Sequence, residues 1–174
     1  QAPSGAGYAL ENRIVMARTL PTLFRDAQVQ RLANFFQTLS DYLVTLTRKE
    51  SPLIVLLTPG PHNETYFEHA YLARYLGFPL VESADLTVRD NRVYLKTLNG
   101  LKQIDLILRR VDGEFCDPLE LRTDSLLGVG GLVAAVRAGN VIIANSLGSG
   151  LVECEALMSF LPALSQQILG ENLL

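Results

Sequence analysis

Hydrophobic residues recur at helical spacing in the segment that runs from Val29 to Leu46. The spacing places the apolar side chains on one face of a helix and leaves the other face polar. We expect an amphipathic helix whose apolar face packs against the core, with a partner-binding helix as the alternative. The apolar positions are Val29, Leu32, Phe35, Phe36, Leu39, Tyr42, Leu43 and Leu46.

Short, nearly unbroken apolar runs predict the centre of a sheet. They are Leu53–Leu57, Ile104–Leu108 and Val141–Ala144, and they lack the alternation of a half-exposed strand. Strands that are buried on both faces have this pattern, which is typical of a parallel sheet covered by helices. Leu80–Glu82 predicts a further, shorter strand.

Two alternating runs that follow Leu80–Glu82 predict a β-hairpin. Leu86–Arg89 and Arg92–Leu95 flank the dipeptide Asp90-Asn91. A two-residue loop of this kind joins antiparallel strands, although Asp-Asn is a weaker signal than Asp-Gly. We therefore expect the hairpin as an insertion in the parallel sheet.

Helices are expected between and after these strands. Asn63 can cap a helix over Glu64–Leu76 that Gly77 ends, and another follows near Gly131–Ala138. A third runs from about Leu151 to Leu169, where Pro162 can divide it. The order of strands and helices predicts an α/β fold, Rossmann-like, with a mostly parallel sheet flanked by helices.

The first 28 residues interrupt this pattern because they are rich in Gly, Pro and Ala. We expect an irregular, extended arm here, with at most a short helix near Glu11–Ala17, that is mobile or packs on a neighbouring molecule. Residues 29–174 then form a single domain. Gln1 in place of Met and an apolar end at Leu173-Leu174 suggest a piece of a longer protein.

Composition restricts the class of protein. A chain of 174 residues with 48% hydrophobic and 19% charged residues is long and apolar enough for one ordinary globular domain. The net charge of −3 argues against nucleic-acid binding, and the longest apolar runs are too short to span a membrane. Cys116 and Cys154 have no metal-ligand spacing, so we expect no metal site and, by default, a cytoplasmic protein.

Ligands of open parallel sheets bind beyond the carboxyl ends of the strands, so we consider the residues that follow each strand. After the first strand, Gly60 permits a close backbone approach and Asn63 precedes a helix start that can receive an anion. A plain turn with a helix cap is the alternative. Glu68 and His69 follow in the helix, and Glu68 can orient His69 or contact an amine.

Two arginines end the central strand. Arg109 and Arg110 point to opposite faces because they are neighbours in a strand, and Asp112 follows them. A buried guanidinium needs an anionic partner, which is either a protein carboxylate or a bound substrate. The internal candidates are Asp112, Glu82 and Asp117. We expect the arginine that faces the crevice to bind substrate and the other to be neutralised internally.

The last strand leads into a glycine-rich turn. Asn145 is followed by Gly148, Ser149 and Gly150, whose backbone N–H groups can form an anion-binding nest. A structural connection is the alternative, because the turn is neither a Walker loop nor a dinucleotide fingerprint. The sequence contains no recognisable catalytic triad or nucleophile elbow, and we assign no catalytic residue.

Seven segments, in order, resemble the circularly permuted ATP-grasp family, whose members include glutathionylspermidine-synthase-like proteins. The segments are Tyr8–Arg13, Leu57–Gly60, Tyr66–Ala70, Leu80–Glu82, Ile107–Asp112, Phe115–Leu119 and Ala144–Gly150. The resemblance implies a carboxylate–amine ligase, in which ATP phosphorylates a carboxylate and an amine attacks the acyl phosphate. It also implies that this chain is the Rossmann-like, pre-ATP-grasp part of such an enzyme.

The family's lysine and glycine-rich nucleotide loop and its acidic metal ligands have no match here. The resemblance therefore implies that ATP and Mg²⁺ bind elsewhere in the full-length protein and that this chain alone does not bind Mg·ATP tightly. Its partners would be the remaining ATP-grasp domains and a small anionic or amino-acid-like substrate. A non-catalytic interaction module with purely structural arginines is the alternative function.

Overall fold

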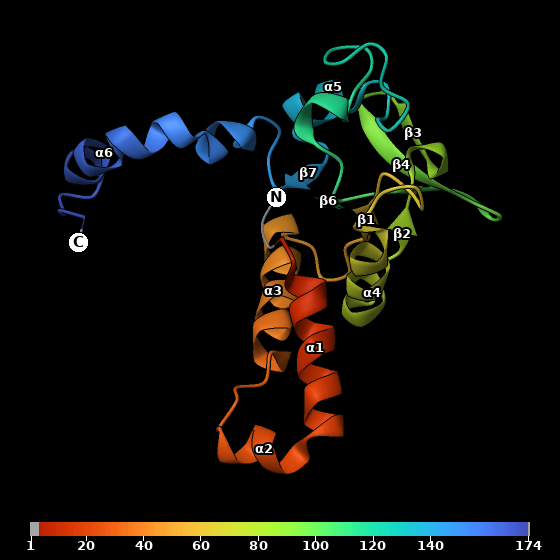
Figure 1. Ribbon diagram of the computed structural model, residues 1–174. Helices are drawn as coiled ribbons and strands as arrows, with labels where there is room; N and C mark the ends of the chain where they lie inside the picture. The colour runs from red at the N-terminus through yellow and green to blue at the C-terminus, as the bar shows by residue number, and fades with distance from the viewer. Residues whose placement is uncertain (1–3, 174) are drawn as a thin grey trace.

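The computed structural model describes residues 4–173. Figure 1 shows a central sheet with a helical lobe on one side and an extended C-terminal segment. The elements, in chain order, are α1 (Ala6–Thr19), α2 (Pro21–Asp26), α3 (Ala33–Thr47), β1 (Ile54–Leu57), α4 (Tyr66–Leu76), β2 (Leu80–Val81), the 3-10 turn η1 (Ser83–Asp85), β3 (Leu86–Arg89), β4 (Arg92–Thr97), β5 (Gly100–Gln103), β6 (Leu106–Arg109), η2 (Gly113–Phe115), α5 (Leu132–Arg137), β7 (Ile142–Ala144), η3 (Ser149–Glu153), η4 (Glu155–Phe160) and α6 (Leu161–Ile168).

The four strands β2, β1, β6 and β7 lie side by side in that order and are all parallel. In the register, Ile54 of β1 is paired with Leu106 of β6, which is paired with Ile142 of β7. The strand ends are therefore aligned along one edge. This sheet and the separate antiparallel hairpin sheet confirm the expected α/β class.

Both faces of the parallel sheet are buried, as the unbroken apolar runs predict. Side chains alternate across β1, so Leu56 joins the cluster under α1, α3 and α4, whereas Val55 joins the opposite one. The first cluster includes Phe36 of α3 and Leu72 of α4. The second cluster packs β1 against α5 and the hairpin sheet. The result is a three-layer arrangement with the sheet in the middle.

The predicted hairpin is confirmed, and it continues into a third strand that the sequence analysis did not anticipate. Asp90 and Asn91 both have positive φ angles, 49° and 54°, which matches a two-residue loop between twisted strands. β4 extends to Thr97 and turns back through Leu98-Asn99 into β5. Exposed polar residues and a glycine in β5 weaken the alternating pattern that identified its neighbours.

The prediction of an irregular arm over residues 1–28 is wrong for residues 6–26, which form α1 and α2; residues 1–3 lie outside the described part. The arm also packs on its own domain. Leu10 is buried in the cluster between the parallel sheet and the helices α1, α3 and α4, and the rings of Tyr8 and Phe67 are stacked 6.2 Å apart. The pattern was obscured because α1 buries only Gly7 and Leu10, so its apolar face is narrow.

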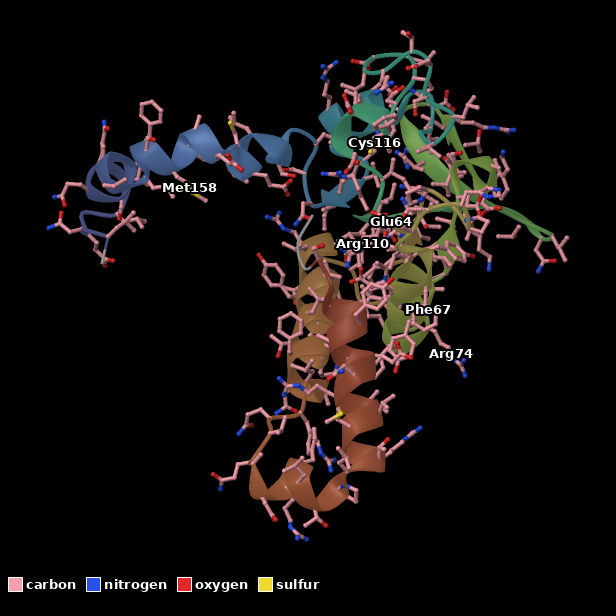
Figure 2. The ribbon with its side chains drawn as sticks, viewed as in Figure 1. Glu64, Phe67, Arg74, Arg110, Cys116 and Met158 are labelled. Carbon is pink, nitrogen blue, oxygen red and sulfur yellow. The ribbon has the colours of Figure 1, made fainter. Side chains whose placement is uncertain are left out.

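The helix expected over Leu151–Leu169, with a possible division at Pro162, is replaced by two 3-10 segments and the short helix α6. Pro162 does not divide a helix but lies in the first turn of α6, where its missing N–H costs nothing. This C-terminal segment extends away from the sheet after β7 (Figure 1). Figure 2 shows Met158 on it, away from the remaining side chains of the domain.

Candidate functional site

The loops that follow β1, β6 and β7 meet at the carboxyl edge of the parallel sheet. Leu57, the last residue of β1, is paired with Arg109, the last residue of β6. Leu108 is in turn paired with Ala144 at the end of β7. The sheet thus brings together candidate residues that are far apart in the sequence. They fall into two groups, one on each side of β6.

On the β1 side, Gly60 allows the loop to turn beside β2. Its φ angle is +100°, and a Cβ atom at this position would lie 3.0 Å from the Glu82 carboxylate. Glu82 itself accepts the backbone N–H of Asp85 and so caps η1. The Glu82 side chain thus leaves no room for a Cβ atom at position 60 and stabilises the turn η1.

Asn63 lies ahead of α4 and does not cap it directly, which corrects the expected helix start at Glu64. Thr65 occupies the N-cap position. The Asn63 Oδ1 atom accepts the backbone N–H of Thr65 at 2.9 Å and its hydroxyl at 2.5 Å. Asn63 therefore closes an Asx turn, and its carbonyl oxygen is used within the loop.

His69 joins the end of β1 to this turn. Its Nδ1 lies 2.9 Å from the Thr58 hydroxyl, and its Nε2 lies 3.1 Å from the Thr65 hydroxyl. Because the Thr65 hydroxyl donates its hydrogen to Asn63, it accepts from Nε2–H. Nδ1 then accepts the hydrogen of Thr58. The neutral tautomer of His69 with its hydrogen on Nε2 therefore satisfies both hydrogen bonds of the ring.

The electrostatic surroundings of His69 agree with a neutral ring. Burial and the nearby positive charge of Arg110 lower the pKa of His69 from 6.5 to about 4. A proton on Nδ1 would also force the Thr58 hydroxyl to turn its hydrogen away from the ring. His69 is thus a structural link at neutral pH, and it is an unsuitable general acid there.

Glu68 lies on the other side of the same helical turn and is also buried. Its Oε1 atom accepts the backbone N–H of Gly7 at 3.1 Å, so its charge lies at the N-terminus of α1. A Cβ atom at Gly7 would come within 2.5 Å of the Glu68 side chain, which explains the glycine. Glu68 therefore holds the start of α1, a role that differs from the orientation of His69 or the amine contact suggested by the sequence.

Arg110 is also buried, and its positive charge acts on His69. Burial lowers the pKa of its guanidinium, and the negative charge of Glu68 raises it, so the two groups are electrostatically coupled. This arrangement matches the expectation that one arginine of the pair faces a helical layer. Glu68 is thus a carboxylate whose charge acts on Arg110, and it was not among the internal candidates that the sequence suggested.

Arg109 points to the opposite side and is 3% exposed. Its Nε donates to the carbonyl of Asn145 at 3.0 Å, and its Nη1 donates to the carbonyl of Val111 at 2.6 Å. Its Nη2 donates to the Ser146 carbonyl and to the Ser149 hydroxyl, both at 3.2 Å. The guanidinium thus fixes the loop after β7 through oxygen atoms that carry no net charge.

A cavity of about 400 Å³ opens beside this loop. Its polar lining includes Arg109, Ser149 and three carboxylates, namely Asp112, Glu114 and Glu153. Gly148 and Gly150 also line it, and Gly148 adopts a positive φ of 83°. The expected residues Arg109, Asp112, Gly148, Ser149 and Gly150 are therefore brought together here. Gly60, Asn63, Glu68, His69, Arg110 and Asn145 are not part of its lining.

Asp117 is a fully buried carboxylate that the sequence analysis considered only as a partner for an arginine. Its Oδ1 accepts the backbone N–H groups of Leu119 and Gly131, and its Oδ2 accepts that of Val133. It therefore joins the loop after β6 to the start of α5. The Asp-Pro dipeptide signals the turn, but only the fold brings Gly131 within reach.

Thr58 and Thr65 were also missed by the sequence analysis. Their hydroxyls belong to the site only because the fold places the His69 ring between them.

Among residues 4–173, no group of three or more His, Cys, Asp or Glu side chains could hold a metal ion. Over the same residues, no helix has the length and hydropathy that crossing a membrane requires.

Comparison with known proteins identifies the family. The circularly permuted ATP-grasp type 2 family matches residues 1–174. The chain is 47% identical over 174 residues to the uncharacterized protein Rv2567 of Mycobacterium tuberculosis, with 99% of this chain and 20% of that protein covered.

Two further relatives show the same relationship. Rv2411c of the same organism, also uncharacterized, is 43% identical, and the match covers 99% of this chain and 32% of that protein. The uncharacterized protein sll0335 of Synechocystis is 39% identical, with 99% and 36% covered. The chain thus spans between a fifth and little more than a third of these relatives. It belongs to the circularly permuted ATP-grasp type 2 family.

Proposed function

We propose that this chain is the substrate-side domain of an ATP-dependent ligase that joins a carboxylate to an amine, related to the glutathionylspermidine-synthase-like enzymes. The observation that carries the proposal is family membership over all 174 residues. ATP-grasp enzymes divide their site between several domains. In this proposal, ATP and Mg²⁺ bind to other parts of the full-length protein, because the sequence has no match to the family's lysine and glycine-rich nucleotide loop or to its acidic metal ligands.

The cavity beside the β7 loop is the proposed substrate site. It lies beyond the carboxyl edge of a parallel sheet, where ligands of such folds bind. The described part of its lining carries the carboxylates of Asp112, Glu114 and Glu153 beside the Arg109 guanidinium, and these acceptors suit the ammonium group of an amino-acid-like substrate. Ser149 offers a hydroxyl for the polar remainder of such a molecule.

Arg109 contributes to this site by positioning. Its four hydrogen bonds hold the loop that carries Ser149 against β6. The shape of the cavity therefore depends on the guanidinium even where the substrate does not touch it. This differs from the expectation that the crevice-facing arginine binds substrate directly.

The ligase proposal is tested on the full-length protein with hydroxylamine as the amine. The protein is incubated with Mg·ATP, hydroxylamine and each of the protein amino acids in turn, and hydroxamate and ADP are measured. We expect ADP and hydroxamate in equal amounts for at least one carboxylate. ADP release that no carboxylate stimulates, or no release at all, would contradict the proposal.

Calorimetry of residues 1–174 with Mg·ATP tests whether the nucleotide binds to this part of the protein or to the rest of it. We expect no micromolar binding to this chain and clear binding to the full-length protein. Tight binding to the chain alone would show that the nucleotide site lies within it.

A non-catalytic interaction module is the second candidate, favoured by the internal bonding of Arg109. The variants Ser149→Ala and Glu114→Gln, made in the full-length protein, distinguish the two. Both side chains line the cavity, so a ligase would lose turnover or raise its KM for the amine while the melting temperature changes little. If the protein is an interaction module, neither the unmodified protein nor the variants will cleave ATP.

A further inference from the structure

An apolar groove with a basic rim opens in the helical lobe, far from the strand ends. Its volume is about 360 Å³, at the lower end of the range for ligand pockets. The lining that the described residues form contains no Asp or Glu. Its floor includes Ile14, Phe24 and Leu32, and its rim carries Arg13, Arg18 and Arg31.

Two of the three rim arginines have exposed side chains. Arg18 and Arg31 are exposed, whereas Arg13 is half-buried and donates to the backbone carbonyl of Gln30 at 2.5 Å. α2, which closes one end of the groove, buries none of its own residues. The groove is therefore an apolar surface with positive charge at its edge and little intrinsic covering.

The C-terminal segment has the complementary character. Residues 149–173, which we call the acidic arm, contain Glu153, Glu155 and Glu171 and no Lys or Arg. Phe160 is 61% exposed and Ile168 is 72% exposed. Phe160 ends η4, and in α6 the apolar residues Leu161, Leu164 and Ile168 follow at helical spacing on one face. The arm thus presents an apolar stripe flanked by negative charge.

Within residues 4–173, the two surfaces do not meet. The acidic arm leaves the sheet at β7 and extends away from the lobe, whose far end is formed by α2 (Figure 1). An amphipathic helix that lies in an apolar groove is a common mode of recognition, and opposite charges at the rim select the partner. A second copy of the chain supplies both the helix and the charges.

We propose that the acidic arm of one copy packs into the basic groove of a second copy, and that the exchange is mutual. Each arm would cover the other molecule's groove, and a two-fold axis would close the assembly. Both exposed apolar surfaces are then buried in a dimer of the chain. The proposal is independent of the ligase function.

A charge exchange tests the pairing. The groove variant combines Arg18→Glu with Arg31→Glu, and the arm variant combines Glu155→Arg with Glu171→Arg. Each variant alone places like charges at both contacts, so we expect its dimer to be about tenfold weaker or more in sedimentation experiments. An equal mixture of the two variants restores opposite charges at both contacts and should dimerise again.

Other outcomes overturn the proposal. If the unmodified chain is monomeric at the highest soluble concentration, the arm has no partner in a second copy. If a chain carrying all four substitutions is restored but the mixture is not, the arm folds onto its own groove. Leu98→Ser, at a fully exposed hairpin position, is the matched control and should leave association unchanged.

Discussion

Arg109 and Arg110 are adjacent in the sequence, but their surroundings give them different energetic roles. Arg110 lies near a buried carboxylate, whereas Arg109 is bonded to three backbone carbonyls and one hydroxyl. Alternation along a strand predicts that the two face apart. It does not predict the partners, because those belong to loops that reach the strand only in the fold.

Replacing Arg109 should destabilise the domain, in contrast to what its place at a crevice suggests. Arg109→Ala leaves several carbonyl oxygens without donors, so we expect the free energy of unfolding to fall by about 3 kcal/mol. Arg109→Lys should recover only part of this, since one ammonium group cannot reproduce a planar fork. Urea unfolding measures both, with the exposed Arg89→Ala as control. Equal midpoints for the alanine variant and the control would refute this role.

His69 should make stability depend on pH. Its pKa is lowered to about 4 in the folded protein, while the unfolded chain binds the proton near pH 6.5. Above pH 6.5 neither state is protonated and the stability is fully present. Between pH 6.5 and 4 only the unfolded state gains the proton, so stability falls by up to about 1.4 kcal/mol per pH unit.

The measurement compares unfolding of the unmodified chain with that of His69→Gln between pH 7 and 4. Carboxylates contribute the same background to both, so the difference between the two curves isolates His69. We expect this difference to shrink as the pH falls. Parallel curves would mean that the ring is accessible to protons in the folded state.

At the scale of elements, the attachment of α1 depends on one carboxylate. Glu68→Ala removes the acceptor of the Gly7 N–H and the charge that acts on Arg110. We expect a loss of about 3 kcal/mol or more, since removing one member of a buried charged pair is costly. Glu64→Ala, at an exposed position just before α4, is the matched control. Hydrogen exchange should show α1 losing protection before the strands do.

The turn after β1 offers a comparison between two glycines of nearly equal φ. Gly60 and Gly100 have φ angles of +100° and +102°, but only Gly60 faces a close neighbour, Glu82. Both alanine variants bear the strain of a positive φ, of order 1 kcal/mol. Gly60→Ala should be measurably less stable than Gly100→Ala in thermal unfolding. Identical losses would mean that Glu82 moves aside without cost.

Elements with a strong period were predictable from the sequence, and their partners were not. The parallel strands and the helix around Phe36 were identified because burial on defined faces leaves a repeating apolar pattern. Helix α1 was not predicted, because its only buried residues, Gly7 and Leu10, produce no repeating apolar pattern. The cavity residues near Gly148 were found by their place after a strand, whereas Asp117 acts on backbone groups that are distant in sequence.

At the scale of the whole molecule, the basic groove is separate from the cavity and from the acidic arm. The cavity lies at the carboxyl edge of the sheet and takes Ser149, Gly150 and Glu153 from the start of the arm, whereas the groove lies in the helical lobe (Figure 1). Substitutions in the groove are therefore expected to leave the cavity intact, because distant substitutions are usually additive. This separation allows the ligase proposal and the dimer proposal to be tested with independent variants.

The parallel register also has a consequence for how the chain acquires its structure. Ile54 is paired with Leu106, which emerges 52 residues later during synthesis. Until then β1 exposes an apolar run with no neighbour but the short β2, while β3, β4 and β5 need only local turns to pair. We expect the antiparallel hairpins to form first and shorten the loop that must close. The nascent chain is most prone to aggregation in the interval before β6 arrives.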